Sequence, residues 1–241
     1  MKIITVEDYD ALSRAAAHFI ATTIAAKPDA SIIIPTGNTP VGTYRSLAQM
    51  QRDGLIDASR LRVFQLDEYL GRGSNDPRSF FHWINTEFMQ PLNIPISHVV
   101  RLPGEGCDPQ VACAAYEAAV HAAGGIDLAV LGLGTNGHLG FNEPPVAIDA
   151  PTRTITLTDE TINSNAVYWG GADRVPRQAI TAGLNVVLSA RQTLLLVSGK
   201  AKREILEQVV NGSITPNVPG SYLQGVDNVT VITDREAWPQ G

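Results

Sequence analysis

The sequence predicts an α/β fold, in which a doubly wound, mostly parallel sheet carries helices on both faces. Short apolar runs of strand length alternate with amphipathic stretches, which is the pattern of parallel strands joined by helices. Hydrophobic residues make up 44% of the 241 residues and charged residues 17%, so the chain can bury a substantial core. Because no internal repeat or long linker interrupts this pattern, we expect a single domain over residues 1–241.

The helices are predicted from apolar residues that recur every three or four positions. For the first helix, Thr5 and Asp8 resemble a capping box, apolar residues between positions 12 and 24 form a buried stripe, and Lys27-Pro28 ends the pattern. The later helices are expected at residues 41–51, 78–89, 108–123 and 200–210.

The strands are predicted from short runs that are either apolar throughout or alternate between polar and apolar residues. They are expected at residues 31–34, 61–66, 126–133, 152–158, 192–198 and 229–233. The strand at 61–66 stops at Asp67-Glu68, and the strand at 126–133 runs into a long glycine-rich loop. This succession of strands and helices is typical of a Rossmann-like sheet.

Composition excludes several classes of protein. The net charge of −6 argues against a general partner of nucleic acids or anionic membranes, and the apolar runs are far shorter than the ~20 residues that span a bilayer. Acidic residues stand near the N-terminus where a signal peptide would be apolar. Cys107 and Cys113 form no CxxC pair, so we expect buried or incidental thiols in a reducing cytoplasm, with no disulfide framework or metal site.

In doubly wound sheets, ligands bind beyond the carboxyl ends of the strands. The first such segment contains Thr36, Gly37, Asn38 and Thr39 between two prolines. A glycine turn with hydroxyl side chains before a helix can hold a phosphate through backbone N–H groups and the helix dipole. It lacks the lysine of a Walker loop. An ordinary turn in which Thr39 caps the helix is the alternative.

The second segment places Asp67 and Glu68 at the end of a buried strand. Adjacent side chains on a strand point to opposite sides, so we expect only one of them to enter a pocket. A carboxyl group beside a partly desolvated site can have its pKa raised enough to carry protons. The alternative is a solvated strand end with an acidic helix cap.

The third segment, residues 132–144, surrounds His138 with glycines and places Glu143 five residues later. It contains GxGxxG, but no helical pattern follows, so a dinucleotide site is disfavoured. A histidine titrates near neutral pH, and a nearby carboxylate can orient it, which suits proton transfer at a sugar ring oxygen. The alternative is a loop histidine whose hydrogen bonds go to the backbone.

The fourth segment crowds Lys200, Lys202 and Arg203 into the first turn of a helix, where the helix dipole disfavours cations. A bound anion would offset that cost, and Lys200 is nearest to the strand end. A solvated basic turn, balanced by later glutamates, is the alternative. Together the four segments predict a site for a phosphorylated small molecule that undergoes proton transfers.

Four motifs in this order resemble the glucosamine-6-phosphate deaminase family, whose superfamily also holds galactosamine-6-phosphate deaminases and 6-phosphogluconolactonases. They are Pro-Thr-Gly-Asn-Thr-Pro (35–40), Leu-Asp-Glu-Tyr (66–69), Gly-Leu-Gly-Thr-Asn-Gly-His-Leu-Gly-Phe-Asn-Glu-Pro (132–144) and Ser-Gly-Lys (198–200). The resemblance implies that an aminohexose 6-phosphate and water become a ketohexose 6-phosphate and ammonia, without a cofactor.

The resemblance also assigns roles. Asp67 would move a proton between C2 and C1, His138 would open the sugar ring, Glu143 would pair with His138, and Asn136 would assist by hydrogen bonding. The substrate, with its phosphate held by the residues from Thr36 to Thr39 and by Lys200, would also contact Glu68 and Gly137.

The sequence departs from the family at several positions. Asn38 stands where glycine is common, and Val167 stands where a phosphate-binding arginine is expected, with Arg174 or Arg177 as substitutes. Val167 and residues 181–184 look more like the galactosamine-6-phosphate branch. The C-terminal extension of the allosteric members is missing, so we expect little allosteric control.

Other functions remain as alternatives. They are a galactosamine-6-phosphate deaminase that yields tagatose 6-phosphate, a 6-phosphogluconolactonase, a non-catalytic sugar-phosphate sensor and, last, a dinucleotide oxidoreductase. The family resemblance leaves open whether the chain forms a homo-oligomer and whether residues 152–171 form a mobile lid. The expected partner is a small sugar phosphate.

Overall fold

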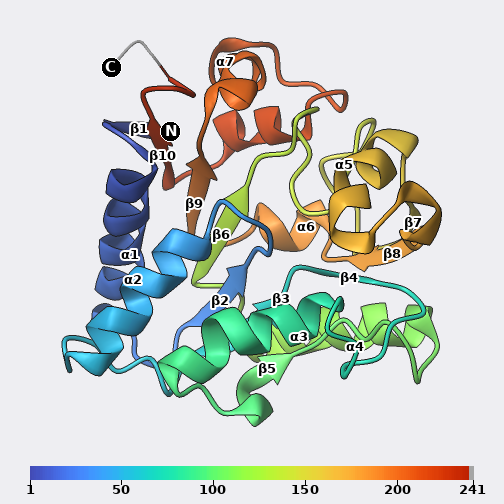
Figure 1. Ribbon diagram of the computed structural model, residues 1–241, viewed down its shortest axis with the longest axis horizontal. Coiled ribbons are helices and arrows are strands. Elements are labelled where there is room, and N and C mark those ends of the chain that lie inside the picture. Colours follow the sequence, from blue (N-terminus) through green and yellow to red (C-terminus); the bar gives the residue numbers. More distant parts are fainter. Residues whose placement is uncertain (239–241) are drawn as a thin grey trace.

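A seven-stranded sheet, parallel throughout, forms the centre of the computed structural model, which describes residues 1–238 (Figure 1). The strand order is β1-β10-β9-β6-β2-β3-β5. The chain builds outward from β2 to β3 and β5, then returns to β6 and builds in the other direction. The strands are β1 (Lys2–Val6), β2 (Ser31–Ile34), β3 (Arg62–Gln65), β5 (Val99–Val100), β6 (Leu128–Gly132), β9 (Gln192–Val197) and β10 (Val229–Asp234).

The strand order reverses between β2 and β6, which are direct neighbours in the sheet. The loops that leave these two strands therefore diverge, and a crevice opens at their carboxyl ends. This is the position at which open α/β sheets bind ligands, so the topology alone directs attention to residues 35–40 and 133–144.

Helices cover both faces of the sheet. Alternate residues of β2 point to opposite faces: Ile33 belongs to one buried cluster, and Ile32 and Ile34 belong to the other. The helices are α1 (Tyr9–Ala26), α2 (Val41–Arg52), α3 (Phe80–Ile84), α4 (Pro109–Ala122), α5 (Asp159–Trp169), α6 (Leu184–Val187) and α7 (Arg203–Asn211). Shorter helical turns lie at Asn85–Met89, Gln90–Leu92, Ile96–His98, Ala172–Arg174, Lys200–Lys202 and Pro219–Gly225.

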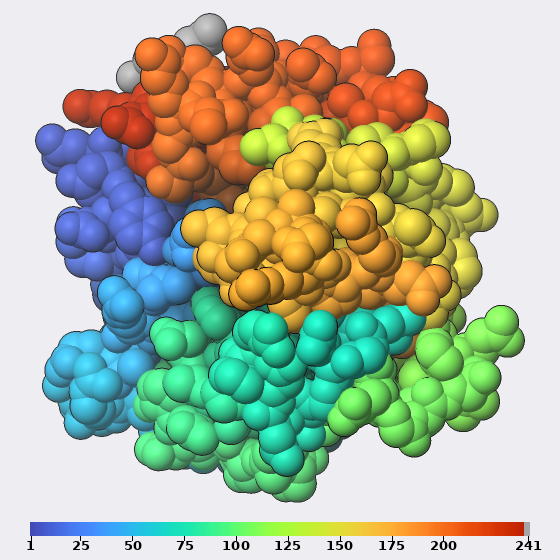
Figure 2. Space-filling view, turned by 45° about the vertical axis from the view of Figure 1, so that its right-hand side comes forward, coloured from blue at the N-terminus to red at the C-terminus, as the bar shows by residue number. Residues whose placement is uncertain are grey.

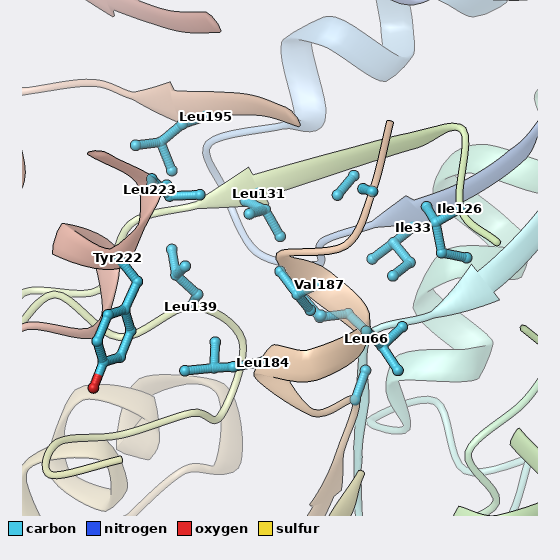
Figure 3. Packing of buried hydrophobic residues seen from close by; sticks show 14 of the residues in the cluster. Ile33, Leu66, Ile126, Leu131, Leu139, Leu184, Val187, Leu195, Tyr222 and Leu223 are labelled. Carbon is cyan, nitrogen blue, oxygen red and sulfur yellow. The ribbon is translucent and has the colours of Figure 1, made fainter. Parts of the chain in front are cut away.

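The cluster that contains Ile33 lies beneath the candidate site. Figure 3 shows Ile33, Leu131 and Leu195 from three neighbouring strands packed against side chains of α6 and of the Pro219–Gly225 turn. Leu66 and Leu139, which flank the second and third predicted site segments, belong to the same cluster. The core thus anchors those two segments directly.

A second, antiparallel sheet of three strands lies beside the first. Its order is β4 (Asp67–Tyr69), β8 (Gln178–Thr181) and β7 (Arg153–Thr156). The cluster of Tyr69, Phe141, Ile162 and Trp169 joins this sheet to α5. The small sheet and α5 therefore stand together at one side of the molecule (Figure 1).

The fold class and the expected strands of the main sheet are confirmed, but several boundaries are corrected. The capping box is wrong, because Thr5 lies in β1 opposite Thr233 and Asp8 alone caps α1. The strand expected at 61–66 is β3, which ends at Gln65. Asp67 and Glu68 do not belong to a loop after it but begin the next strand, β4. The strands β1, β5 and β8 were not predicted, and the helix expected at 78–89 is α-helical only over α3 and then widens into a π-helical turn.

The helix expected at 200–210 starts with a 3₁₀ turn, and α7 begins only at Arg203. Cys107 is exposed and Cys113 is buried, and both are free thiols. In residues 1–238, no helix has the length and hydropathy needed to cross a membrane.

Candidate functional site

A cavity of about 510 Å³ opens where the loops after β2 and β6 diverge. Its volume is in the range of small-ligand sites. The loops after β2 and β6, the start of β4, the N-terminal end of α3 and one face of α5 line it. Figure 2 shows the α5 region, in yellow and gold, standing at the surface between the orange C-terminal segments and the teal residues of the α3 region.

The loop after β2 contributes Thr36, Gly37, Asn38 and Thr39 to one end of the cavity, and we call these four residues the cradle. Gly37 has φ of +94°, a conformation that favours glycine. Pro40, and not Thr39, stands at the cap position of α2, which has no side-chain cap bond. At the start of α2 the N–H groups of Val41 and Gly42 already have partners, so the donors left for an anion within residues 1–238 are backbone N–H groups of the cradle itself.

The backbone of the cradle is held in place by two tyrosines. The hydroxyl of Tyr9 donates to the carbonyl of Asn38 at 3.0 Å and accepts the N–H of Gly42 at 2.9 Å. The hydroxyl of Tyr44 donates to the carbonyl of Pro35 at 2.8 Å. These bonds fix the loop before any ligand arrives, which reduces the ordering cost of binding.

Asp67 lies in the cavity wall, and its side chain makes no hydrogen bond within residues 1–238. It is 6% exposed, and burial, together with the neighbouring charge of Glu68, raises its pKa to about 8. The backbone at this point is fixed by Gln65, whose amide donates to the carbonyl of Asp67 at 2.9 Å and accepts from Leu102 N at 3.2 Å. The carboxyl group is thus rigidly placed and available for proton transfer.

Glu68 points away from the cavity, so the expectation of a substrate contact there is corrected. Its carboxylate accepts hydrogen bonds from the backbone N–H groups of Tyr69, Phe80 and Phe81, each at 2.9 Å, and from Gln65 Nε2 at 3.1 Å. Burial raises the pKa of Glu68, and these donors oppose the rise. Glu68 therefore anchors the N-terminal end of α3, and only one of the two adjacent acids enters the pocket, as the strand geometry predicts.

His138 lines the cavity, and its ring is oriented by Asn136. The Oδ1 atom of Asn136 lies 2.7 Å from His138 Nδ1 and also accepts the backbone N–H of His138 at 3.2 Å. Because the backbone N–H identifies this atom as the amide oxygen, which can only accept, the contact favours the tautomer with the proton on Nδ1 and Nε2 as the acceptor. Gly134 packs against the ring so closely that any Cβ would overlap it.

The charge of His138 is set by opposing influences. Burial lowers its pKa most, and the charge of Lys202 adds to this effect, whereas Glu143 and Glu160 oppose it. The imidazole is therefore neutral near pH 7 and able to accept a proton.

Glu143 acts on His138 through its charge and forms no hydrogen bond with it. Its Oε2 accepts the N–H of Thr158, the N-cap residue of α5, at 3.2 Å. Its Oε1 is buried and without a partner in the described chain. Neither Glu143 nor Asn136 lines the cavity, and Gly137 is packed against Val218. The structure thus places these three residues outside the lining of the cavity.

Lys202, and not Lys200, reaches the cavity. Lys200 is exposed, whereas Lys202 is half-buried, and burial lowers the pKa of Lys202 against the opposing charge of Glu160. Both residues belong to a 3₁₀ turn, in which successive side chains point about 120° apart. Proximity to the strand end pointed to Lys200, whereas the side chain at the cavity belongs to Lys202, two positions later in the same turn.

The wall formed by α5 was missed by sequence reasoning. Thr161, Ser164, Asn165 and Tyr168 line the cavity at the i, i+3, i+4 and i+7 spacing of one helix face. Val167 lies off that face and is 78% exposed. The signal was available in the polar residues of this helix, but they also suit an ordinary solvent-facing helix.

The expected substitutes for an arginine at position 167 do not line the cavity. Arg177 lies 3.9 Å from the exposed carboxylate of Asp159, and Arg174 also stands outside. Within residues 1–238, the lysine and arginine side chains that line the cavity are Lys202 and Arg78. The guanidinium of Arg78 is bound to Asp76 at 3.0 Å and stacks on Trp169, 4.8 Å from the ring centre.

Across residues 1–238, no group of three or more histidine, cysteine, aspartate or glutamate side chains has the arrangement of a metal site. The cavity instead joins an anion cradle, a carboxyl group with a raised pKa and a neutral imidazole. Such a set can bind a phosphorylated molecule and move protons on it.

Comparisons with known proteins match nearly the whole chain. The family described as glucosamine-6-phosphate isomerases/6-phosphogluconolactonase matches residues 7–232. A glucosamine-6-phosphate deaminase of Thermoanaerobacter sp. (strain X514) is 39% identical over 237 residues, which cover 98% of this chain and 94% of that protein. The matched region includes the cradle, Asp67, His138 and Lys202.

Solved structures show the same fold. A structure described as a monomeric glucosamine-6-phosphate deaminase superposes with a TM-score of 0.97 at 37% identity, over 100% of both chains. The 6-phosphogluconolactonase of Trypanosoma cruzi has a TM-score of 0.78 at 21% identity, covering 99% of this chain and 96% of that one. The second likeness is one of fold alone.

Proposed function

Because the chain belongs to the family of glucosamine-6-phosphate isomerases and 6-phosphogluconolactonases, we propose that it is a glucosamine-6-phosphate deaminase. It converts glucosamine 6-phosphate and water into fructose 6-phosphate and ammonia. The observation that carries the proposal is Asp67, a buried carboxyl group in the cavity with its pKa raised to about 8. A base of this kind has a use in moving a proton between carbon atoms, and lactone hydrolysis does not require it.

The phosphate binds in the cradle in this proposal. The hydroxyl groups of Thr36 and Thr39 and the backbone N–H groups of the cradle donate to its oxygens, and Lys202 supplies a positive charge. We assign this charge to Lys202 in place of Lys200, because Lys202 reaches the cavity.

Ring opening comes first and depends on His138. With Nδ1–H held by Asn136, the neutral ring accepts the proton of the O1 hydroxyl at Nε2. The C1–O5 bond then breaks, O5 takes the proton from Nε2, and C1 becomes an aldehyde carbon. The charge of Glu143 stabilises the imidazolium that forms between these two transfers.

Isomerisation and deamination follow at Asp67. The ionised carboxylate removes the proton from C2, the electron pair forms the C1=C2 double bond of an enolamine, and O1 takes a proton from water as the C1 carbonyl becomes a hydroxyl group. The same carboxyl group then returns its proton to C1, and the amino nitrogen gives one proton back to water. The product is an imine at C2. Water adds to C2, the C2–N bond breaks, and ammonia leaves as the C2 ketone forms. The raised pKa allows Asp67 to keep the proton between removal and return.

These groups belong to one chain, so we propose that the site is complete without a partner subunit. The reaction uses water and a small sugar phosphate and needs no redox cofactor. We propose the cytoplasm as its place, where phosphorylated sugars are metabolised.

Ammonia release from glucosamine 6-phosphate and galactosamine 6-phosphate, assayed side by side, tests the proposal and chooses between the two epimers. Asp67→Asn should lower the rate of ammonia release by roughly a thousandfold or more, because general-base catalysis contributes about 10²–10⁴. Ammonia from neither substrate would overturn the proposal. If the chain instead hydrolyses 6-phosphogluconolactone and Asp67→Asn keeps that activity, it is a lactonase.

A further inference from the structure

A hydrogen bond crosses the cradle end of the cavity and joins two segments far apart in the sequence. The side-chain amide of Asn38, in the cradle, donates from Nδ2 to the hydroxyl oxygen of Tyr168, on α5, at 2.8 Å. Both residues line the cavity. Because Nδ2 belongs to a cradle residue, the bond fixes the hydroxyl of Tyr168 beside the proposed phosphate position.

Both sides of this hydrogen bond are anchored. The main-chain carbonyl of Asn38 accepts a hydrogen bond from Tyr9. This bond fixes the main chain of the cradle, from which the side-chain amide of Asn38 extends. Tyr168 lies on the cavity-facing row of α5, next to Trp169, which is buried in the aromatic cluster of the small sheet. The hydroxyl of Tyr168 therefore stays at the cavity although the residue is 55% exposed.

The hydrogen bond between Asn38 and Tyr168 leaves the hydroxyl proton of Tyr168 free to be donated. The hydroxyl oxygen of Tyr168 accepts from Asn38, and its own proton is used by no contact within residues 1–238. A phosphate group offers acceptors, so it can take this proton. Accepting a hydrogen bond polarises the O–H group and strengthens it as a donor.

We propose that Tyr168 is a phosphate ligand from α5 and that Asn38 is the positioning residue that aims its hydroxyl. The inference rests on the proposed function for the identity of the ligand, a sugar 6-phosphate. The α5 residues that line the cavity carry no positive charge, and Val167 is exposed outside it. The neutral phenol of Tyr168 is therefore the group that α5 offers to the phosphate. Lys202, which also lines the cavity, supplies the positive charge.

The test compares Tyr168→Phe, Asn38→Ala and the double variant with the wild type. Each is assayed for ammonia release from glucosamine 6-phosphate and for binding of inorganic phosphate by calorimetry. Val167→Ala, an exposed neighbour on the same helix, is the matched control. Circular dichroism shows whether each variant keeps the fold, which we expect because Tyr168 and Asn38 are exposed.

Tyr168→Phe should raise KM for the sugar phosphate and Kd for inorganic phosphate by about tenfold each, with little change in kcat, since the contact is made before and during the reaction. Asn38→Ala should raise both constants by about threefold alone and add nothing when combined with Tyr168→Phe, because it acts through the hydroxyl. Val167→Ala should change neither constant.

Unchanged phosphate binding in Tyr168→Phe would overturn the inference, and so would effects of the two substitutions that multiply. A folded wild type that binds no phosphate would overturn it as well. If the wild type releases no ammonia but Tyr168→Phe still weakens phosphate binding, the proposed function fails and the phosphate ligand stands.

Discussion

The Nδ1 atom of His138 lies 2.7 Å from the side-chain oxygen of Asn136, two residues earlier in the same loop. This contact decides which ring nitrogen faces the substrate, because the oxygen can only accept. A histidine in the other tautomer would present an N–H group to the O1 hydroxyl and could not take its proton.

Replacing Asn136 with alanine should therefore lower kcat by about tenfold to a hundredfold, with a smaller effect on KM, since the ring loses its tautomer preference and not its position. Steady-state kinetics on the aminohexose 6-phosphate measures this. Asn136→Asp is the informative comparison: its carboxylate still accepts from Nδ1, so it should keep most of kcat while raising the pKa of His138. Equal losses in both variants would contradict the tautomer argument.

The carboxyl group of Asp67 should titrate near neutral pH in the free protein. Burial and the charge of Glu68 raise its pKa to about 8, so the group is protonated at pH 6 and ionised at pH 10. Infrared difference spectroscopy between these two conditions should show loss of a carboxylic-acid C=O band in the wild type and not in Asp67→Asn. Because the base must be ionised, kcat/KM should rise with pH over the same range. A wild-type spectrum identical to that of Asp67→Asn would refute this assignment.

Glu68→Gln should destabilise the protein more than it affects substrate binding. The carboxylate accepts the N–H groups at the start of α3, and an amide there would turn an NH₂ group toward one of these donors. We expect a loss of about 1–3 kcal/mol in the free energy of unfolding. Urea denaturation measures the loss, and KM of the folded variant is the control. A raised KM at unchanged stability would instead support the substrate contact that the sequence suggested.

Lys202→Met should weaken binding of the sugar phosphate by about thirtyfold or more, because it removes the positive charge proposed for the phosphate. Lys200→Met, two residues away in the same turn, is the matched comparison and should behave as wild type, since Lys200 is exposed and outside the cavity. KM and the inhibition constant of inorganic phosphate give the answer. If Lys200→Met weakened phosphate binding more than Lys202→Met, Lys200 would be the residue that supplies the positive charge.

The five central strands of the main sheet could be predicted from the sequence because they are mostly apolar runs buried on both faces, whereas the edge strands β1 and β5 are only partly buried and were not predicted. Ile32 and Ile33 belong to buried clusters on opposite faces of the sheet. A short uninterrupted apolar run of this kind is therefore stable as a strand inside the sheet, where both faces are covered. The rule that ligands bind at the carboxyl ends of parallel strands then located Asp67 and His138 at the cavity.

The small sheet could not be predicted in the same way. Asp67 pairs with Thr181, a partner 114 positions later, and strands of three or four residues give too little pattern to reveal such a pairing. The direction of Lys202 depends on a 3₁₀ turn, and that of Glu143 depends on the N-cap of α5. Neither the turn type nor the contact with the N-cap can be read from the properties of the single residues.

The row of residues along α5 has a consequence for how such enzymes diversify. Asn136, His138 and Asp67 are held by hydrogen bonds or packing that do not involve Thr161, Ser164, Asn165 or Tyr168. The groups proposed for proton transfer and the α5 face can therefore vary separately. Exchanging side chains along α5 would change the lining of the cavity while the side chains proposed for the chemistry keep their supports.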